Sequence, residues 1–391
     1  MSKLQELINK LCPNGVEFKP LGEVCEIKRG VRVVKQELEE FGDIPVFQNS
    51  LKPLGYYKLS NFKGFTSFVI GAGAAGEIGF SEKPFWAADD CFVIISNYLN
   101  DKYIFYCLQN NQLHLKRQVR KASIPRLSRV SIEKFMIPIP PIEVQEEIVR
   151  ILDSFSDYAA ELQAELQARK QQYEYYRNLL LTFNPSAYGC GTDDEQKDGV
   201  TTWGGHNYKI QWKKMGEICD NMDKLRKPVT ASTRISGIYP YYGASGVVDY
   251  VNNYIFDGSY LLISEDGANL LARSTPIAFS IYGKTWVNNH AHVLHFNSDV
   301  TRKFVEYFIN NLDISKYVSG GAQPKLNQKK LNSILIPIPP LELQEKIASI
   351  LDRFETLVND LTNGLPAEIA AVKDQYEYYR NKLLTFKKLS A

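Results

Sequence analysis

Residues 137–155 read IPIPPIEVQEEIVRILDSF, and residues 336–354 read IPIPPLELQEKIASILDRF. A second pair of matching segments lies further along, QYEYYRNLLLTF at 172–183 and QYEYYRNKLLTF at 375–386. Matches of this length do not arise by chance, so the chain contains an internal duplication. Each copy consists of a long divergent block followed by a near-constant segment. We therefore expect the two divergent blocks to share a fold but to differ in surface chemistry.

Weaker matches extend the duplication into the divergent blocks. LGEVC at 21–25 corresponds to MGEIC at 215–219, and Trp86 corresponds to Trp286. These matches lie far from the constant segments. They therefore support duplication of the whole unit.

The near-constant segments are predicted to form long helices. Proline pairs at 140–141 and 339–340 mark their starts, because proline is tolerated in the first turn of a helix but not in its interior. Beyond each pair, apolar residues recur at alternating spacings of four and three, which is typical of a coiled-coil seam. Two long seams in one chain favour helices that pack on each other over helices buried separately against their own divergent blocks.

The seam of the second copy contains one irregularity. An extra step of four falls between Leu365 and Ile369, beside Gly364 and Pro366, and indicates a stutter. The expected seam passes through Leu361 just before this point.

The divergent blocks are predicted to be mixed and mostly β, which makes the chain an α+β protein. Short apolar runs bounded by Gly, Asn and Asp predict strands at 66–70, 91–95, 260–264 and 292–296. Short helices are expected at 103–115 and 302–312. The polar stretch after Phe183, rich in Gly and Asp, predicts a linker. The expected divisions are a short N-terminal helix at 1–12, a divergent domain at 13–140, a constant helix at 141–183, a linker at 184–207, a second divergent domain at 208–339 and a constant helix at 340–391.

Charge is unevenly distributed along the chain. Over all 391 residues, 46 Lys and Arg are balanced by 44 Asp and Glu. The block 13–140 holds 17 basic against 13 acidic residues, and 205–339 holds 15 against 10, whereas 141–204 holds 5 against 12. Positive charge concentrated in the two divergent blocks suits a polyanionic partner.

Several protein classes are excluded by composition. No apolar run is long enough to span a membrane, and the first eleven residues lack the apolar stretch of a secretory signal. The six cysteines are scattered, with no CxxC pair and no histidine at zinc-finger spacing. We therefore expect reduced thiols, no metal site and a cytoplasmic location.

The motifs that could carry catalysis are weak or absent. Residues 71–76 read GAGAAG, but a dinucleotide or S-adenosylmethionine site needs a helix next, and residues 77–84 read as strand and turn. The chain has no phosphate-binding GxxxxGK[ST] loop and no Asn-Pro-Pro-Tyr element of amino-methyltransferases. We expect no catalytic residue and no cofactor bound by this chain.

With catalysis set aside, the remaining candidate function is non-covalent contact with DNA. Lys and Arg neutralise phosphates and bind guanine edges, whereas Asn and Gln can pair with adenine. In the first divergent block the candidate DNA-binding residues are Lys28, Arg29, Arg32, Gln48, Asn49, Lys116, Arg117, Arg120, Lys121 and Arg126. In the second they are Lys224, Arg226, Lys227, Gln323, Lys325 and Lys329. For any one of these residues a solvated surface position is the simpler interpretation, so the hypothesis rests on their collective placement.

The IPIPP element, the E-x-Q-E-x-I helix and the QYEYYR and LLTF segments resemble the specificity subunits of type I restriction-modification systems. The resemblance covers nearly the whole chain, and both constant segments carry the signature. It implies that the divergent blocks are target-recognition domains, each reading one half of a bipartite, asymmetric DNA site. It also implies that the constant helices pack as an antiparallel coiled coil, which sets the spacing between the half-sites.

The resemblance further implies partners. Two methyltransferase subunits would dock on the constant helices and carry the S-adenosylmethionine, and motor-nuclease subunits could join them. Because the helix starts are near-identical while the lobes diverge, the candidate partner-binding residues are Gln145, Glu146, Gln344 and Glu345. A different class remains open, a non-enzymatic adaptor whose two lobes bind proteins or glycans. Loss of binding with rising salt would distinguish a DNA reader from such an adaptor.

Overall fold

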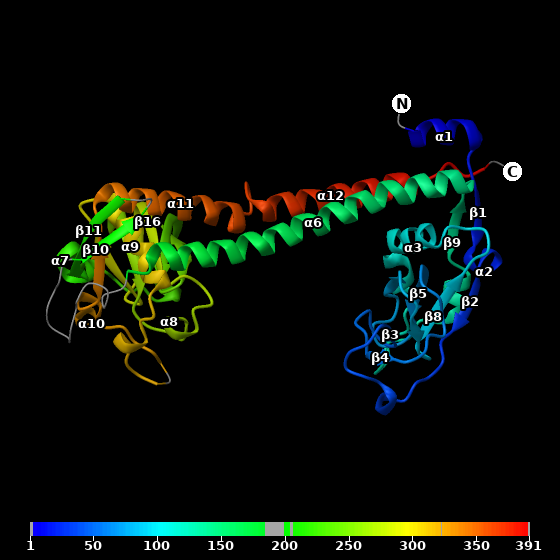
Figure 1. The fold of residues 1–391 in the computed structure, drawn as a ribbon, viewed down its shortest axis with the longest axis horizontal. Coiled ribbons are helices and arrows are strands. Elements are labelled where there is room, and N and C mark those ends of the chain that lie inside the picture. The colour runs from blue at the N-terminus through cyan, green and yellow to red at the C-terminus, as the bar shows by residue number, and fades with distance from the viewer. Residues whose placement is uncertain (1–2, 184–198, 204–205, 322, 390–391) are drawn as a thin grey trace. The chain divides into compact units, whose positions relative to one another are not determined.

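The computed structural model describes residues 3–183, 199–203, 206–321 and 323–389. The chain divides into two compact units (Figure 1). Unit 1 contains residues 1–164 and 368–391, and unit 2 contains residues 165–367. Each unit therefore combines one divergent block with parts of both constant segments. We call residues 13–140 the first lobe and residues 208–339 the second lobe.

Unit 1 is built on three small sheets. A four-stranded antiparallel sheet, in the order β2-β8-β5-β6, forms the body of the first lobe beside the sheet β4-β3-β7 and the pair β1-β9. Helix α3 packs on β5 and β6. The elements are α1 (Lys3–Leu11), β1 (Glu17–Pro20), α2 (Leu21–Val24), β2 (Glu26–Arg29), η1 (Lys35–Glu37), β3 (Ile44–Phe47), β4 (Gly55–Tyr57), β5 (Thr66–Ile70), β6 (Ile78–Ser81), β7 (Trp86–Ala87), β8 (Cys91–Ile95), α3 (Asp101–Asn110), α4 (Gln112–Arg117), α5 (Arg129–Glu133), β9 (Met136–Ile139) and the first part of α6 (Ile142–Leu181).

Unit 2 repeats this plan with a larger central sheet. Its six strands are ordered β12-β17-β15-β16-β13-β14, and a second sheet is ordered β10-β11-β18. Helix α9 packs on β15 and β16. The elements are β10 (Gly199–Trp203), β11 (His206–Lys214), α7 (Met215–Ile218), β12 (Asp220–Asn221), η3 (Asp223–Leu225), η4 (Ala231–Thr233), β13 (Ser236–Gly243), β14 (Gly246–Val251), β15 (Phe256–Ser264), α8 (Asn269–Ala272), β16 (Ala278–Val287), β17 (Ala291–His295), α9 (Asp299–Asn311), η5 (Ser315–Tyr317), α10 (Gln328–Asn332), β18 (Leu335–Ile338), α11 (Leu341–Asn359) and the start of α12 (Leu365–Leu383).

The two central sheets correspond strand by strand. Strands β2, β8 and β5 of unit 1 match β12, β17 and β15 of unit 2 in order and in antiparallel pairing. The register agrees as well, because Ile70 lies opposite Cys91 where Ser264 lies opposite Ala291. The predicted α+β duplication is confirmed at the level of strand register.

The long helices begin where the proline pairs predict. Helix α6 starts directly after Pro141, and α11 starts directly after Pro340. Within unit 1, α6 runs antiparallel to α12, and the ring of Phe155 stacks on that of Tyr379 with centroids 5.4 Å apart. The Tyr158 hydroxyl also donates to Glu368 at 2.6 Å. The same end of α6 contributes buried residues such as Ile148 to the core of the first lobe, so this helix packs both on its lobe and on α12.

At the predicted stutter the helix is interrupted. The prediction that Leu361 belongs to the coiled-coil seam is wrong. Helix α11 ends at Asn359, α12 begins at Leu365, and the Leu361 side chain is 79% exposed. The Asp360 carboxylate accepts from the backbone N–H groups of Thr362 and Asn363, at 2.7 and 3.2 Å. Such local bonds offer the backbone an alternative to the helix, so the chain turns here.

A matching hydrogen bond ties each lobe to its own long helix. The Tyr106 hydroxyl on α3 donates to Asp153 on α6, and the Tyr307 hydroxyl on α9 donates to Asp352 on α11, both at 2.5 Å. Burial and the neighbouring carboxylates raise the pKa of both tyrosines, which therefore remain donors. The lobes are thus fixed to the starts of their helices by the same bond.

The linker predicted at 184–207 extends too far at its C-terminal end. Residues 199–203 form β10, which pairs antiparallel with β11, so the C-terminal end of the stretch predicted as linker belongs to a sheet. Its Thr-Thr-Trp sequence is β-prone, and the flanking glycines and aspartates obscured that signal. Residues 184–198 lie outside the described part of the chain. Among the described helices, none has the length and apolar character needed to cross a bilayer.

Candidate nucleic-acid interface

The first lobe gathers its candidate residues at one end of the four-stranded sheet. Strands β2 and β5 end there, at Arg29 and Ile70, and β8 begins there, at Cys91. The Arg29 Nε donates to the Asp89 carbonyl at 2.7 Å, and this bond holds the guanidinium group against the loop before β8. Loops that leave a rigid sheet edge are suited to present contact residues.

The glycine loop at 71–76 lies at this end, and its amides are bonded within the lobe. The Gly73 N–H donates to the Pro125 carbonyl at 3.1 Å, and the Ala74 N–H donates to the Asn49 carbonyl at 2.9 Å. Gly73 has a φ of 81°, and a β-carbon there would lie 2.8 Å from the Asn49 carbonyl oxygen. The loop leads into strand β6, so it lacks the helix N-terminus of a dinucleotide site. Its role is to allow a close approach between backbone segments.

Candidate residues from distant parts of the sequence meet around this loop. Asn49 packs against Gly73, and the Lys116 side chain packs against Gly76. A β-carbon on Gly76 would lie only 3.1 Å from the Lys116 Cγ. Arg126 forms a β-bridge with Ala72 on one side and with Arg120 on the other. The glycine loop therefore brings together three of the predicted segments.

The side chains of these residues face solvent. All eight candidate cations of the first lobe are exposed, as is Asn49, and Gln48 is half-buried. Only Lys28 among these cations has an ion pair in the described structure, at 3.1 Å from Glu26. The sheet end of the first lobe therefore presents a set of cations able to neutralise phosphates.

The second lobe places most of its candidates at the corresponding sheet end. Lys224, Lys227, Gln323, Lys325 and Lys329 are exposed. In contrast, the predicted contact residue Arg226 is only 13% exposed, which leaves little of its side chain available to DNA.

Arg226 belongs to a buried network that is centred on His292. Its Nη1 donates to Glu265 and to the Ala291 carbonyl, both at 2.7 Å. His292 is 1% exposed, with Nδ1 2.6 Å from an Asp223 carboxylate oxygen and Nε2 2.7 Å from the Leu326 carbonyl oxygen. The imidazole ring of His292 thus lies between two oxygen acceptors, one from a carboxylate and one from the backbone.

The network keeps its carboxylates ionised. Burial opposes ionisation of Asp223, but the hydrogen bond and charge of His292 hold the pKa of this carboxyl below its ordinary value. Burial likewise opposes ionisation of Glu265, but Arg226, His292 and Lys325 together outweigh it and lower the pKa of Glu265. Lys325 adds an ion pair to the same carboxylate at 3.1 Å.

Asp223, Glu265 and His292 have ligand atoms within 4.8 Å of one another, a spacing that could suit a metal ion. However, Arg226 and Lys325 already neutralise Glu265, and His292 bonds to Asp223. A cation would have to displace these partners, so the arrangement is that of an ion-pair network. No sequence pattern indicated this cluster, because its members are far apart along the chain.

Two of the four residues predicted to bind a partner are buried. Gln145 is 1% exposed, donates from Nε2 to the Pro140 carbonyl at 2.8 Å and accepts from the Asn100 N–H at 3.0 Å. Gln344 is 1% exposed and donates to the Pro339 carbonyl at 2.6 Å. The prediction that these glutamines face a partner is wrong. They are constant because they fix the proline turn to the first turn of the helix.

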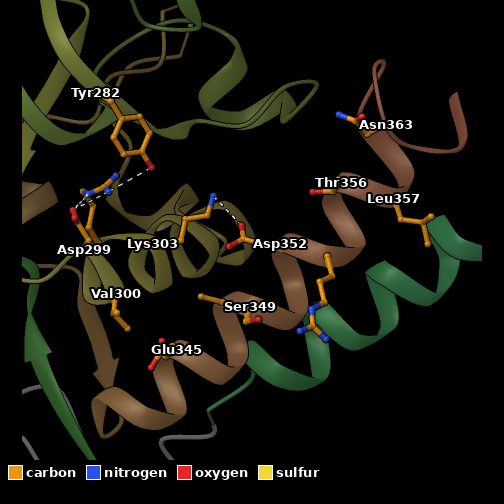
Figure 2. Close-up of a pocket in the computed structure, with 13 residues that line it drawn as sticks. Tyr282, Asp299, Val300, Lys303, Glu345, Ser349, Asp352, Thr356, Leu357 and Asn363 are labelled. Carbon is orange, nitrogen blue, oxygen red and sulfur yellow. Dashed lines mark hydrogen bonds and ion pairs between the residues drawn. The ribbon is translucent and has the colours of Figure 1, made fainter. Parts of the chain in front are cut away.

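The two glutamates are exposed. Glu345 lines an open groove of about 910 Å³ between α9 and α11 of unit 2 (Figure 2). In this groove Lys303 of α9 lies 3.2 Å from Asp352 of α11, an ion pair that holds the two helices together (Figure 2). Glu146, the counterpart of Glu345, occupies the first exposed turn of α6.

Comparison with known proteins identifies the domain type. The family model of the type I restriction modification DNA specificity domain matches residues 13–169 and 208–371. The EcoR124I/EcoR124II specificity subunit of Escherichia coli is 31% identical over 312 residues, which cover 73% of this chain and 71% of that one. A Haemophilus influenzae protein, named as a specificity subunit, is 37% identical over 186 residues, which cover 46% of this chain and 48% of that relative.

Solved structures show the same fold. The specificity subunit from M. genitalium aligns with a TM-score of 0.61 at 17% identity, over 95% of this chain and 96% of that one. A chain from a structure on complex assembly and conformational transition of the type I system aligns with a TM-score of 0.55 at 17% identity, over 95% and 98%. The alignment of folds thus extends over both lobes and both constant segments.

Proposed function

The chain belongs to the specificity subunits of type I restriction-modification systems, and from this premise we propose that each lobe reads one half of a bipartite DNA site. The observation that carries the proposal is the repeated sheet end. The two lobes share the strand register of this sheet end but carry different exposed side chains on and around it, Arg29 and Lys116 in the first lobe and Lys224 and Lys227 in the second. Because these side chains differ, the two half-sites differ in sequence and the whole site is asymmetric.

The constant helices supply the other two functions in this proposal. They set the distance between the half-sites, and their exposed faces near Glu146 and Glu345 dock two methyltransferase subunits. Those partners, with S-adenosylmethionine, perform the methylation, and motor-nuclease subunits can join them. This chain contributes recognition and no catalytic group.

Methylation mapping tests the proposal directly. Genomic DNA from cells with and without this chain, in the presence of its partner subunits, is sequenced for modified bases. We expect a two-part motif with a fixed gap that disappears when the chain is deleted. A motif that persists without the chain, or one continuous motif, contradicts the proposal.

A helix insertion tests the spacing function. Four helix-forming residues inserted between Leu166 and Arg169 add about 6 Å and rotate the remainder of the helix by only about 40°, which keeps the seam nearly in phase. We expect both half-sites to be kept and the gap between them to lengthen. Insertion of two residues rotates the seam by about 200° and should abolish assembly. Full methylation of the unaltered motif by the four-residue variant would exclude a measuring role for these helices.

A further inference from the structure

The loop that follows the first strand of each central sheet carries one exposed candidate contact residue, Arg32 in the first lobe and Lys227 in the second, and another lies just before it. In the first lobe this loop is 30–34, after β2, and in the second lobe it includes 226–230, after η3. Neither stretch belongs to a helix or strand. A loop of this kind needs specific bonds to hold its side chains in one arrangement.

The same pair of hydrogen bonds holds both loops. In the first lobe, the Val31 N–H donates to the Ala87 carbonyl at 2.9 Å, and the Trp86 indole N–H donates to the Val31 carbonyl at 2.7 Å.

In the second lobe, the Lys227 N–H donates to the Val287 carbonyl at 3.3 Å, and the Trp286 indole N–H donates to the Lys227 carbonyl at 2.7 Å. Both tryptophans are half-buried, and the residue after each is fully buried. We call each pair of bonds a tryptophan clasp.

The strand that holds each tryptophan is itself fixed. Trp86 pairs in parallel with Val46 of β3, and Trp286 pairs in parallel with Tyr241 of β13. In the first lobe the ring of Tyr57 also meets the indole edge-on, with centroids 5.0 Å apart. The donor is therefore presented from a rigid support to a loop that has no regular structure.

The clasp uses only the backbone of the loop residue. It therefore accepts valine in one lobe and lysine in the other, and it leaves the neighbouring side chains free to diverge. We infer that Trp86 and Trp286 are positioning residues for DNA recognition, which hold the loops that carry Arg32 and Lys227 in their contact arrangement. This inference rests on the proposed function. It separates a constant support from a variable reading surface within each lobe.

The substitution that tests the clasp is Trp→Phe, which removes the indole donor and keeps an aromatic ring. Trp212 supplies a matched control, because it is 8% exposed and its Nε1 has no hydrogen-bond partner in the described structure. Each variant is made in the full chain and assembled with its methyltransferase subunits. Affinity is measured for duplexes that carry the mapped motif or a library randomised at one half-site.

We expect Trp86→Phe to weaken binding by about three- to tenfold, the usual worth of one net hydrogen bond, and to relax discrimination at one half-site only. Trp286→Phe should relax the other half-site, and Trp212→Phe should change neither. Val31→Ala keeps the backbone bonds and should bind as wild type. Equal effects of Trp86→Phe and Trp212→Phe, or loss of both half-sites together, would overturn the inference.

Amide hydrogen exchange separates this test from that of the proposed function. In the free chain, Trp86→Phe should speed exchange at residues 30–34 and leave β5 and β8 unchanged. Wild-type protein that fails to discriminate between duplexes contradicts the proposed function. Unchanged exchange at residues 30–34 contradicts the clasp itself, whatever the DNA results.

Discussion

The two lobes carry different kinds of residue at two corresponding backbone positions, apolar in the first lobe and charged in the second. In the first lobe Gly71 follows β5 and Phe92 lies in β8, and a β-carbon on the glycine would lie 2.5 Å from the phenylalanine ring. In the second lobe the corresponding positions hold Glu265 and His292, which belong to the buried ion-pair network. At this position the first lobe thus packs an aromatic ring against a glycine, whereas the second lobe pairs charged side chains.

This difference determines which cations are free. In the first lobe the candidate arginines and lysines at the sheet end are exposed. In the second lobe Arg226 and Lys325 both form ion pairs with Glu265, although Lys325 also remains exposed. The excess of basic residues in the second lobe therefore overstates the charge available to DNA. Two lobes with similar net charge should differ in the number of phosphates they neutralise.

Exchange of a whole lobe gives the largest expected effect. When residues 13–140 are replaced by the first lobe of a relative, one half of the methylated motif should change completely and the other should stay intact. The physical reason is that each lobe is a separate unit, tied to the long helices by the bond from Tyr106 or Tyr307. Methylation sequencing measures the outcome. If both half-sites change together, the lobes are not independent readers.

Removal of the buried histidine should be the next largest effect. His292→Phe removes the bond between the ring and Asp223, whose carboxylate keeps the Val293 N–H and Arg226 as partners. Loss of a buried charged pair costs about 3–5 kcal/mol, and we expect the lower end of this range because these partners remain. Thermal unfolding of the full chain measures this loss. His295→Phe is the matched control in the same strand, since this side chain is 43% exposed and its replacement should cost under about 0.5 kcal/mol. Similar losses for the two variants would show that the network does not stabilise the lobe.

Addition of Glu265→Gly to His292→Phe sharpens this comparison. The double variant recreates the Gly71 and Phe92 pair of the first lobe and removes one buried carboxylate. It should therefore be more stable than His292→Phe alone. A further loss of stability would mean that Glu265 contributes independently of the histidine.

Much of the fold could be predicted from the sequence because its signals are local. Strands β5 and β8 occupy the predicted ranges 66–70 and 91–95, and both long helices start after their proline pairs. Alternation of apolar residues and proline stereochemistry need no knowledge of distant contacts. The constant positions of Gln145 and Gln344 were interpreted wrongly, because repetition identifies a constrained residue but not whether a partner or the core constrains it.

The buried network in the second lobe could not be predicted for a different reason. Asp223, Arg226, Glu265 and His292 lie in or directly after three separate elements, η3, β15 and β17, and strand register brings them together. The sequence shows each of them as an ordinary polar residue beside a strand. The same limit explains why Arg226 was grouped with exposed Lys224 and Lys227.

Charge reversal at the first sheet end tests the difference in free cations. Arg117→Glu with Arg120→Glu should weaken DNA binding and reduce the slope of log affinity against log salt by about two, one for each phosphate contact. Arg226→Gln in the second lobe should leave that slope unchanged while it lowers the melting temperature. An unchanged slope for the double variant removes Arg117 and Arg120 from the interface. A reduced slope for Arg226→Gln would return that residue to it.

The smallest expected effect concerns a further difference between the copies. Glu147 of α6 is 3% exposed and bonds Arg150 at 2.6 Å and Lys3 of α1 at 2.8 Å. The hydrogen bond from Arg150, helped by Lys3, lowers the pKa of Glu147 to about 2. The matching position in α11 holds Lys346, which is exposed and pairs with Glu342 one turn earlier.

The carboxylate of Glu147 should therefore stabilise unit 1 in a pH-dependent way. Because its pKa is lower in the folded chain, its contribution is present above the ordinary glutamate pKa of about 4.3 and is lost as pH falls toward 2. Its partners are exposed and screened by solvent, so Glu147→Gln should cost only about 1 kcal/mol at neutral pH. Lys346→Gln is the control and should cost less than about 0.5 kcal/mol. Melting temperatures between pH 5 and about pH 2 should fall less steeply for Glu147→Gln than for wild type. An equally steep fall would mean that other carboxyls control the acid response of unit 1.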